Sequence, residues 1–392
     1  MTDFSLGNNL VIPALQSSDS AQSSKISLSL VLPTFNESEN IEKIIIQLTA
    51  LLDERLPGRY ELIVVDDDSP DQTWAIAAAL ELKFSQLQVL RRQHARGLSS
   101  AVIRGWQVAR GGVLGVIDAD LQHPPETLIG LWEGIEAGAD LSTASRHVSS
   151  GGVSDWSFLR RFLSRGAQML GLIVLPEVLG RLSDPMSGFF LVRRSVIADK
   201  KLNPVGYKIL IEVVGRGRIK HIHEVGYVFQ ERFAGKSNVT WRQYWEYIQH
   251  LFTLRLALWA QSRLIRFCLV GGSGVFVDLG VFYVAREILG LALTRSAVLS
   301  AEVAIISNFI LNDIWTFGDY SRRQTGWRKR FKRFIKFNLI SLTGMILNVL
   351  ILNILFNLFG MNEYLAKIIA IIVVAFWNYW FNLKLNWRVT EV

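Results

Sequence analysis

The stretch GGVLGVIDADLQHPPE, residues 111–126, places two closely spaced aspartates directly after a run of apolar residues. The apolar run is typical of a buried β-strand, so Asp118 and Asp120 would lie together at its carboxyl end. Two carboxylates a few ångströms apart repel one another and lose hydration unless a positive charge lies between them. The stretch therefore predicts a strand end that holds a cation.

Two earlier stretches have the same character. ISLSLVLP (26–33) and YELIVVDDD (60–68) are typical of strands, and helical patterns follow them at residues 39–55 and 74–83. Such alternation indicates a mostly parallel sheet covered by helices, in which ligands bind at the carboxyl ends of the strands. The polar clusters TFNE, DDDSPD and DADLQH all follow strands. We therefore expect an α/β, Rossmann-like domain with one crevice lined by all three clusters.

The last third of the chain is of a different kind. Four long segments carry almost no charge, and each is close to the roughly 20 residues that cross a bilayer as a helix. They are residues 267–285, 296–317, 337–362 and 368–383. We therefore expect an integral membrane protein with an all-α domain of four transmembrane helices.

Basic residues gather beside these segments, in a chain whose net charge is +8. The loop SRRQTGWRKRFKRF (321–334) contains seven Lys or Arg residues and no acid. The positive-inside rule places this loop in the cytoplasm, together with the α/β domain and both termini. Because the membrane surface accounts for the basic excess, we expect the lipid bilayer as a partner and no nucleic acid.

The membrane segments repeat internally. A shift of 70 residues superposes Phe267 on Phe337 and Gly274 on Gly344, and SNFILN answers WNYWFN. This pattern predicts a two-helix unit that occurs twice, as two hairpins. The Asn residues that superpose, Asn308, Asn312, Asn378 and Asn382, are costly inside a membrane, and we expect hydrogen bonds between helices there.

Two segments combine aromatic, basic and apolar residues as helices in the headgroup layer do. The first, residues 241–266, separates the two halves of the chain. The second, residues 160–180, has a similar composition and is either a second interfacial helix or a buried helix of the soluble domain.

The cation between Asp118 and Asp120 is expected to be a hard divalent metal. Their carboxylates and the amide oxygen of Gln122 form an all-oxygen set, which suits Mg²⁺ or Mn²⁺ completed by substrate phosphates and water. Zinc prefers His and Cys ligands. The chain has one cysteine, Cys268, and no second histidine at ligand spacing from His123.

Five motifs follow one another in a fixed order: PTFNE, VVDDDSPD, DADLQHPPE, ASR and SDPMSGFFLVRR. In this order they resemble the family-2 inverting glycosyltransferases of the GT-A fold, and most closely the polyprenol-phosphate (dolichol-phosphate) mannose synthases. The resemblance covers about residues 26–240. NFILNDIWTF (308–317) resembles the GtrA-like membrane domains that are fused to some of these synthases.

The resemblance implies roles for the residues at matching positions. Asp118, Asp120 and Arg146 would be catalytic, and Asp118, Asp120 and Gln122 would bind the metal. The positions that would contact the nucleotide-sugar donor or the lipid acceptor are Pro33, Phe35, Glu37, Val65, Asp67, Ala119, Gln122, Arg160, Ser164, Lys208, Arg232 and Lys236.

Some positions depart from the family's pattern or allow two interpretations. Phe35 stands where the family often has Tyr, so an aromatic ring remains without the hydroxyl. The family's Arg-x-x-Gly-x-Ser-Lys loop ends here in Asn238, and we expect Lys236 to supply the missing charge. SDPMSGFF is either a tight turn or part of an acceptor loop, in which Asp184 would have a functional role.

The resemblance implies an enzyme that transfers a hexose with inversion, mannose from GDP-mannose, to polyprenyl (dolichyl) phosphate at the cytoplasmic membrane face. A divalent metal with Arg and Lys side chains would stabilise the departing diphosphate. Two alternatives remain open. The donor could be UDP-glucose or another UDP-sugar, or the chain could be a flippase for a lipid-linked sugar whose soluble domain only binds.

These patterns together divide the chain into four parts. The Ser- and Gln-rich residues 1–25 are expected to be a disordered tail, and residues 26–240 a GT-A glycosyltransferase domain. Interfacial amphipathic helices would occupy residues 241–265, and the GtrA-like four-span domain residues 266–392.

Overall fold

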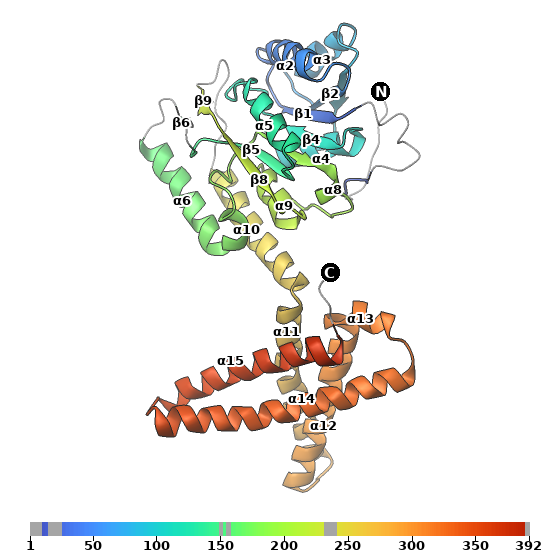
Figure 1. Cartoon of the computed structure of the whole chain (residues 1–392), viewed down its shortest axis with the longest axis vertical. Helices are drawn as coiled ribbons and strands as arrows, with labels where there is room; N and C mark the ends of the chain where they lie inside the picture. Colours follow the sequence, from blue (N-terminus) through green and yellow to red (C-terminus); the bar gives the residue numbers. More distant parts are fainter. Residues whose placement is uncertain (1–9, 15–25, 149–151, 154–157, 231–240, 389–392) are drawn as a thin grey trace. The chain divides into compact units, whose positions relative to one another are not determined.

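The computed structural model describes residues 10–14, 26–148, 152–153, 158–230 and 241–388. The chain divides into two compact units, Met1–Leu256 and Ala257–Val392. The side chains of residues 152–153, 158–165, 241–242 and 261 are outside the description. Each unit is considered by itself (Figure 1).

The first unit is built on a seven-stranded sheet with the strand order β3-β2-β1-β4-β7-β5-β8. The strands are β1 (Leu28–Thr34), β2 (Tyr60–Asp66), β3 (Leu87–Arg91), β4 (Val113–Val116), β5 (Leu141–Ser145), β7 (Phe190–Arg193) and β8 (Ile222–Gly226). Strand β7 runs antiparallel to its neighbours β4 and β5, and the other pairings are parallel. The mostly parallel α/β sheet that the sequence predicts is therefore confirmed.

Helices cover the sheet, which explains why β1 and β2 are mostly apolar and are buried along their whole length. The helices of this unit are α2 (Ile41–Arg55), α3 (Thr73–Glu81), α4 (Leu98–Val108), α5 (Thr127–Glu136), α6 (Phe158–Val174), α7 (Pro176–Leu179), α8 (Arg194–Ile197), α9 (Ile209–Arg216) and α10 (Trp241–Gln261), of which α10 continues into the second unit. Two short strands, β6 (Gly152–Val153) and β9 (Val228–Phe229), pair with each other. In α2, Ile41, Ile44, Ile45 and Leu48 share the buried face at helical spacing.

Part of the expected N-terminal tail has a defined place in the first unit. Val11 forms an antiparallel bridge with Lys201, and Ile12 is completely buried. The backbone N–H of Asp199 donates to the Ile12 carbonyl at 2.9 Å. The structure therefore differs from the expected disorder at residues 10–14, because an apolar stretch pairs there with a strand-like segment nearly 200 residues later in the chain.

The second unit contains four helices that are long and apolar enough to cross a membrane. They are α11 (Arg263–Tyr283), α12 (Leu293–Leu311), α14 (Trp327–Asn353) and α15 (Glu363–Phe381), and each continues into a π-helical turn, η2 (Val284–Ile288), η3 (Asn312–Thr316), η4 (Ile354–Leu358) and η5 (Asn382–Asn386). A short helix, α13 (Gly318–Arg323), precedes α14. Helices α11 and α12 form one hairpin, and α14 and α15 form another (Figure 1). The predicted 70-residue repeat extends to the π-helical turns.

The repeated Asn residues pack differently from the expectation. A Cβ atom on Gly274 would lie 2.4 Å from the Asn308 amide nitrogen, and one on Gly344 would lie 2.6 Å from the Asn378 amide oxygen. Each Asn therefore packs against a glycine of the neighbouring helix, and its Oδ1 atom has no hydrogen-bond partner among the described residues. The prediction of interhelical hydrogen bonds is wrong for these two residues, because the close approach of the helices leaves no donor opposite the amide.

The other Asn pair of the repeat bonds within its own helix. The Asn312 amide donates to the Asn308 carbonyl at 2.9 Å, and Asn382 donates to Asn378 in the same way at 2.8 Å. Each amide nitrogen thus bonds to a carbonyl one turn earlier in the same helix. The predicted hydrogen bonds between helices are therefore not formed by Asn312 and Asn382 either.

Candidate active site

Asp118 and Asp120 follow β4, at the carboxyl edge of the sheet. This is the position at which the sequence predicts a bound cation. Asp120 is buried, and one of its oxygens accepts a hydrogen bond of 3.1 Å from the backbone N–H of Gln122. The Oδ1 atom of Asp118 is buried and has no hydrogen-bond partner among the described residues. The Gln122 amide nitrogen donates to the Gln230 carbonyl at 3.1 Å, which leaves its oxygen as the acceptor end. Three oxygen-bearing side chains thus lie within five residues.

This donor set suits a hard divalent cation. The described residues contain no group of three His, Cys, Asp or Glu side chains close enough to hold a metal by themselves. A cation at Asp118 and Asp120 would therefore need further oxygen ligands, from Gln122, from a substrate phosphate or from water, as Mg²⁺ commonly does. The buried, unpaired Asp118 oxygen is the observation that fits a metal at this position, since buried polar atoms ordinarily have partners.

A glycine makes room for Asp118. Gly188 directly precedes Phe189 and strand β7, and β7 pairs antiparallel with β4. A Cβ atom on Gly188 would lie 2.5 Å from the Asp118 carboxylate oxygen Oδ2. The absence of a side chain at Gly188 therefore lets the carboxylate lie against the SDPMSGFF loop.

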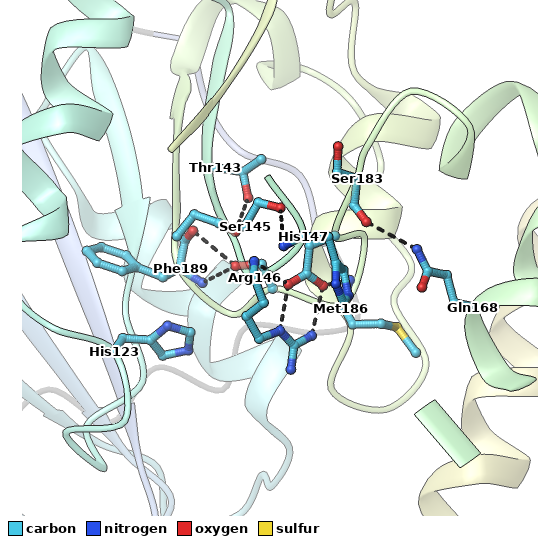
Figure 2. A network of polar contacts seen from close by, with 12 residues as sticks. His123, Thr143, Ser145, Arg146, His147, Gln168, Ser183, Met186 and Phe189 are labelled. Atoms are coloured by element: carbon cyan, nitrogen blue, oxygen red, sulfur yellow. Dashed lines mark hydrogen bonds and ion pairs between the residues drawn. The ribbon is translucent and has the colours of Figure 1, made fainter. Parts of the chain in front are cut away.

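His123, for which the sequence suggested no role, forms the inner wall beside Asp118. It is buried, and its Nε2 atom lies 3.6 Å from Oδ2 of Asp118. The imidazole is surrounded by three aromatic rings, those of Phe189, Tyr227 and Phe229, at centroid distances of 5.7, 5.0 and 5.3 Å. Figure 2 shows His123 next to Phe189 on one side of the polar network. The imidazole thus limits the space into which Asp118 can turn.

Arg146 follows β5 and is held by Asp184 from the SDPMSGFF loop. Its Nε and Nη2 atoms donate to the two carboxylate oxygens at 2.6 and 2.8 Å, and its backbone N–H adds a bond of 3.2 Å (Figure 2). Burial alone would raise the pKa of Asp184, but the hydrogen bonds and the charge of Arg146 outweigh it and hold that pKa below its ordinary value. Asp184 is therefore ionised at neutral pH, and it fixes the plane of the guanidinium.

Lys208 completes the cationic side of the site. Its Nζ atom donates to the Met186 carbonyl at 2.9 Å, so it also lies against the SDPMSGFF loop. The pKa of Lys208 is lowered to about 8, because burial and the charge of Arg146 lower it by more than the charges of Asp118 and Asp184 raise it. The structure thus brings four predicted residues together: Asp118, Asp120, Arg146 and Lys208. In the SDPMSGFF loop, Asp184 bonds Arg146 and Gly188 leaves space for Asp118.

The positions expected to contact the nucleotide lie at the ends of β1 and β2. Pro33 and Val65 are buried and pair with each other in the parallel register. Phe35 is 38% exposed, and the guanidinium of Arg96 lies 5.2 Å from its ring centroid. An exposed ring with a cation above it offers a stacking surface for a planar base.

The other predicted contacts of this region belong to tightly bonded turns. Asp67 accepts hydrogen bonds of 2.7 Å from the Arg92 Nε atom and from the backbone N–H of Gly97. Glu37 accepts a bond of 2.7 Å from the Asn40 amide, and Ala119 is buried between the two aspartates. The ordering of the 92–97 turn by Asp67 is a role that only the fold reveals, because Arg92 follows Asp67 by 25 residues.

Four predicted residues cannot be placed in this site. Arg160 and Ser164 belong to α6, but their side chains are outside the description. Arg232 and Lys236 lie outside the described residues, as does Asn238. Asp184, His123 and Gly188 have contacts in the site that the sequence reading did not assign. Asp184 and Gly188 lie in SDPMSGFF directly before an apolar strand, and His123 lies in the DADLQHPPE motif itself.

Comparison with known proteins adds independent information. Residues 29–199 match the family described as Glycosyl transferase family 2, and residues 266–387 match the GtrA/DPMS transmembrane domain. A dolichol-phosphate mannosyltransferase of Pyrococcus furiosus is 39% identical over 363 residues, which are 92% of this chain and 99% of that protein. A polyprenol monophosphomannose synthase of Mycolicibacterium smegmatis is 33% identical over 220 residues, 54% of this chain and 80% of that protein.

Among solved structures, a mannosyl-3-phosphoglycerate synthase of Rubrobacter xylanophilus is similar with a TM-score of 0.46. It is 24% identical and covers 61% of this chain and 76% of its own.

Proposed function

Because the chain belongs to the dolichol-phosphate mannosyltransferase family, we propose that it transfers mannose from GDP-mannose to a polyprenyl phosphate in the membrane. The observation that carries this proposal is the pair Asp118 and Asp120 at the end of β4, with a buried Asp118 oxygen that has no partner among the described residues. A nucleotide diphosphate brings both the negative charge and the metal that such a pair accepts.

The chemistry follows from the side chains around this pair. A phosphate oxygen of the acceptor attacks the anomeric carbon while the bond to the donor's diphosphate breaks, which inverts the anomeric centre. A divalent cation bound by Asp118, Asp120 and Gln122, Mg²⁺ or Mn²⁺, would supply positive charge to the leaving diphosphate. Arg146 and Lys208 lie on the same side of the site and can stabilise phosphate oxygens.

Asp184 holds Arg146 in a fixed orientation before the substrate binds. It engages two nitrogens of the Arg146 guanidinium, so that Arg146 presents its remaining edge without having to be ordered when the substrate arrives. An acceptor phosphate is anionic at neutral pH, and its oxygen needs no strong general base. The proposal therefore assigns none.

The acceptor is proposed to reach the site from the bilayer, with α6 and α10 lying in the headgroup layer. The described part of α6 exposes Met169 and Ile173, and α10 exposes Trp245 and Phe252. The two helices contact each other, since the Tyr247 hydroxyl donates to the Ala167 carbonyl at 2.9 Å. Exposed apolar and aromatic side chains on adjacent amphipathic helices favour the interfacial interpretation of α6 over that of a buried helix.

The test compares donors and one matched pair of variants. Purified full-length protein is incubated with polyprenyl phosphate, Mn²⁺ and, in turn, GDP-mannose, UDP-glucose and UDP-N-acetylglucosamine. We expect transfer from GDP-mannose, and a loss of at least about 100-fold in the Asp120→Asn variant, because several kcal/mol of metal stabilisation disappear.

Asp53→Asn is the matched control, because Asp53 is exposed on α2 and bonds the Tyr60 hydroxyl at the start of β2, away from the carboxyl edge of the sheet. It should keep most of the activity. Full transfer by Asp120→Asn would contradict the metal assignment, and transfer only from a UDP-sugar would contradict the assignment of the donor.

A further inference from the structure

Two adjoining cavities lie at one end of the second unit, where α11 and α14 begin and α12 ends. The first has a volume of about 500 Å³ and lies between η3, α13 and the first turns of α14. The second has a volume of about 520 Å³ and lies between the start of α11, η3 and α13. Both cavities are lined by residues of α13, which precedes α14 (Figure 1), and Arg322 on that helix lines both.

Both cavities carry positive charge that the described residues do not neutralise. The structure shows no hydrogen bond or ion pair of the Arg322 side chain among the described residues. Arg266 lines the second cavity and donates only to carbonyl oxygens, those of Ala260 at 2.5 Å and Trp315 at 3.3 Å. Two guanidinium groups therefore face these spaces without a carboxylate of their own.

The other three arginines that line the cavities are different, because each contacts a carboxylate, although two of them share the same one. Arg263 bonds to Asp319 at 2.6 Å. Arg333 and Arg330 both pair with Asp313, at 2.9 and 3.1 Å. Arg322 and Arg266 are therefore the lining arginines that have no carboxylate partner among the described residues. Because Arg330 and Arg333 share one carboxylate, that of Asp313, the first cavity has a further excess of positive charge.

The wall of the first cavity is held in place by a buried network. Asp313 is buried and also accepts hydrogen bonds from the Ser321 hydroxyl at 2.7 Å and from the Trp387 indole at 3.2 Å. This network ties η3 to α13, α14 and the end of η5. A cavity with fixed walls binds a ligand without first having to be ordered.

Two tryptophans that line the cavities indicate that the cavities lie at the level of the membrane–water interface. Trp327 lines the first cavity at the beginning of its span and is 77% exposed. Trp315 lines the second at the end of its span and is 45% exposed. Exposed Trp residues at the ends of transmembrane helices lie at the level of the lipid headgroups. The cavities are therefore within reach of lipid phosphate groups.

We propose that these two cavities bind the phosphate group of an anionic membrane lipid, with Arg322 between them and Arg266 as the second contact. The planar fork of arginine matches phosphate oxygens and can donate two hydrogen bonds at once. Basic pockets between transmembrane helices at a membrane face are suited to anionic headgroups for this reason.

Lipid binding to the full-length protein tests the proposal. The protein in phosphatidylcholine nanodiscs is titrated with phosphatidylglycerol, with polyprenyl phosphate and with inorganic phosphate, and bound lipid is counted by native mass spectrometry. We expect Arg322→Gln to weaken binding of the anionic lipids about tenfold, as the loss of a charged hydrogen bond does. Arg323→Gln is the matched control, since Arg323 is the next residue, carries the same charge and lines neither cavity.

The outcomes separate the possibilities. A loss in Arg322→Gln alone supports the proposal, and the tighter of the two lipids identifies the source of the phosphate. Equal losses in both variants would mean that only the general basic surface attracts lipid, and would overturn it. Inorganic phosphate that competes at the affinity of the lipids would overturn the assignment to a lipid. Because binding is measured, the result is independent of mannosyl transfer.

Discussion

At the scale of single residues, the site depends on a few residues that contact Asp118 and Arg146. Gly188 lies against Asp118, His123 lies beside it, and Asp184 holds Arg146. The carboxylates themselves were predictable, because a D-x-D after an apolar strand is a local pattern. Gly188 and Asp184 were not, because they lie 70 and 38 positions from the residues that they contact.

Gly188→Ala tests how strictly the carboxylate must be placed. The new Cβ would lie 2.5 Å from the Asp118 oxygen and must displace it. We expect the rate of transfer to fall at least about tenfold, since catalytic groups tolerate little misplacement, while the thermal unfolding temperature changes little. Gly112→Ala is the control, because a Cβ there would meet nothing within 4 Å. Equal activity in the two variants would contradict the role of Gly188.

At the scale of elements, α10 is fixed to the first unit by one face. Tyr247, His250, Leu251 and Leu254 are buried on that face at helical spacing. His250 Nε2 lies 2.9 Å from Glu212 of α9, and Glu212 also pairs with Arg216. The pattern of α10 predicted an amphipathic helix, but the buried ion pair behind it depends on α9 and could not be read from α10 itself.

The pH dependence of this contact can be predicted. Burial would raise the pKa of Glu212, but the hydrogen bond with His250 and the charge of Arg216 hold it below its ordinary value of 4.5. A carboxylate with a lowered pKa stabilises the fold above its unfolded pKa, and this contribution is lost as the pH falls through the folded value. Glu212→Gln should therefore lower the free energy of unfolding by about 3 kcal/mol at neutral pH.

The measurement is equilibrium unfolding of the full chain in detergent between pH 7 and pH 3. The difference between the wild type and Glu212→Gln should be constant at neutral pH and should shrink below pH 4.5. Glu136→Gln, on an exposed position of α5, should show no such difference. A gap that stays the same in acid would mean that the Glu212 charge does not contribute.

At the scale of the whole molecule, membrane orientation is the property that the sequence predicts and the fold does not test. The basic loop between α12 and α14 should face the cytoplasm by the positive-inside rule. The chain has only one cysteine, Cys268. A Cys268→Ser variant therefore has no cysteine, and a single new cysteine can be introduced at a chosen position for labelling.

A labelling experiment decides the orientation. In intact cells a membrane-impermeant maleimide should label the Asn362→Cys variant, in the loop before α15, without permeabilisation. The Thr325→Cys variant, in the loop before α14, should be labelled only after the membrane is opened. Both positions are exposed in the second unit, so accessibility within the protein is matched. The reverse pattern would place the catalytic unit outside the cytoplasm.

The sequence by itself determined the features that depend on local composition and spacing. Strand–helix alternation specified the sheet, the lengths of uncharged segments specified the four membrane helices, and the 70-residue repeat specified the two hairpins. Side chains on the buried face recur every two residues in a strand and about every 3.6 residues in a helix. This period is visible within a single stretch of sequence, so no knowledge of tertiary contacts is needed to recognise it.

Only the tertiary structure decided how the site is held together. Strand β7 inserts antiparallel between β4 and β5. That pairing puts Gly188 opposite Asp118 and brings Asp184 to Arg146, 38 residues away. No local pattern encodes the insertion, because it depends on pairing between strands that are far apart in the sequence. The sequence therefore supplied the charged groups, and the order of the strands decided which of them meet.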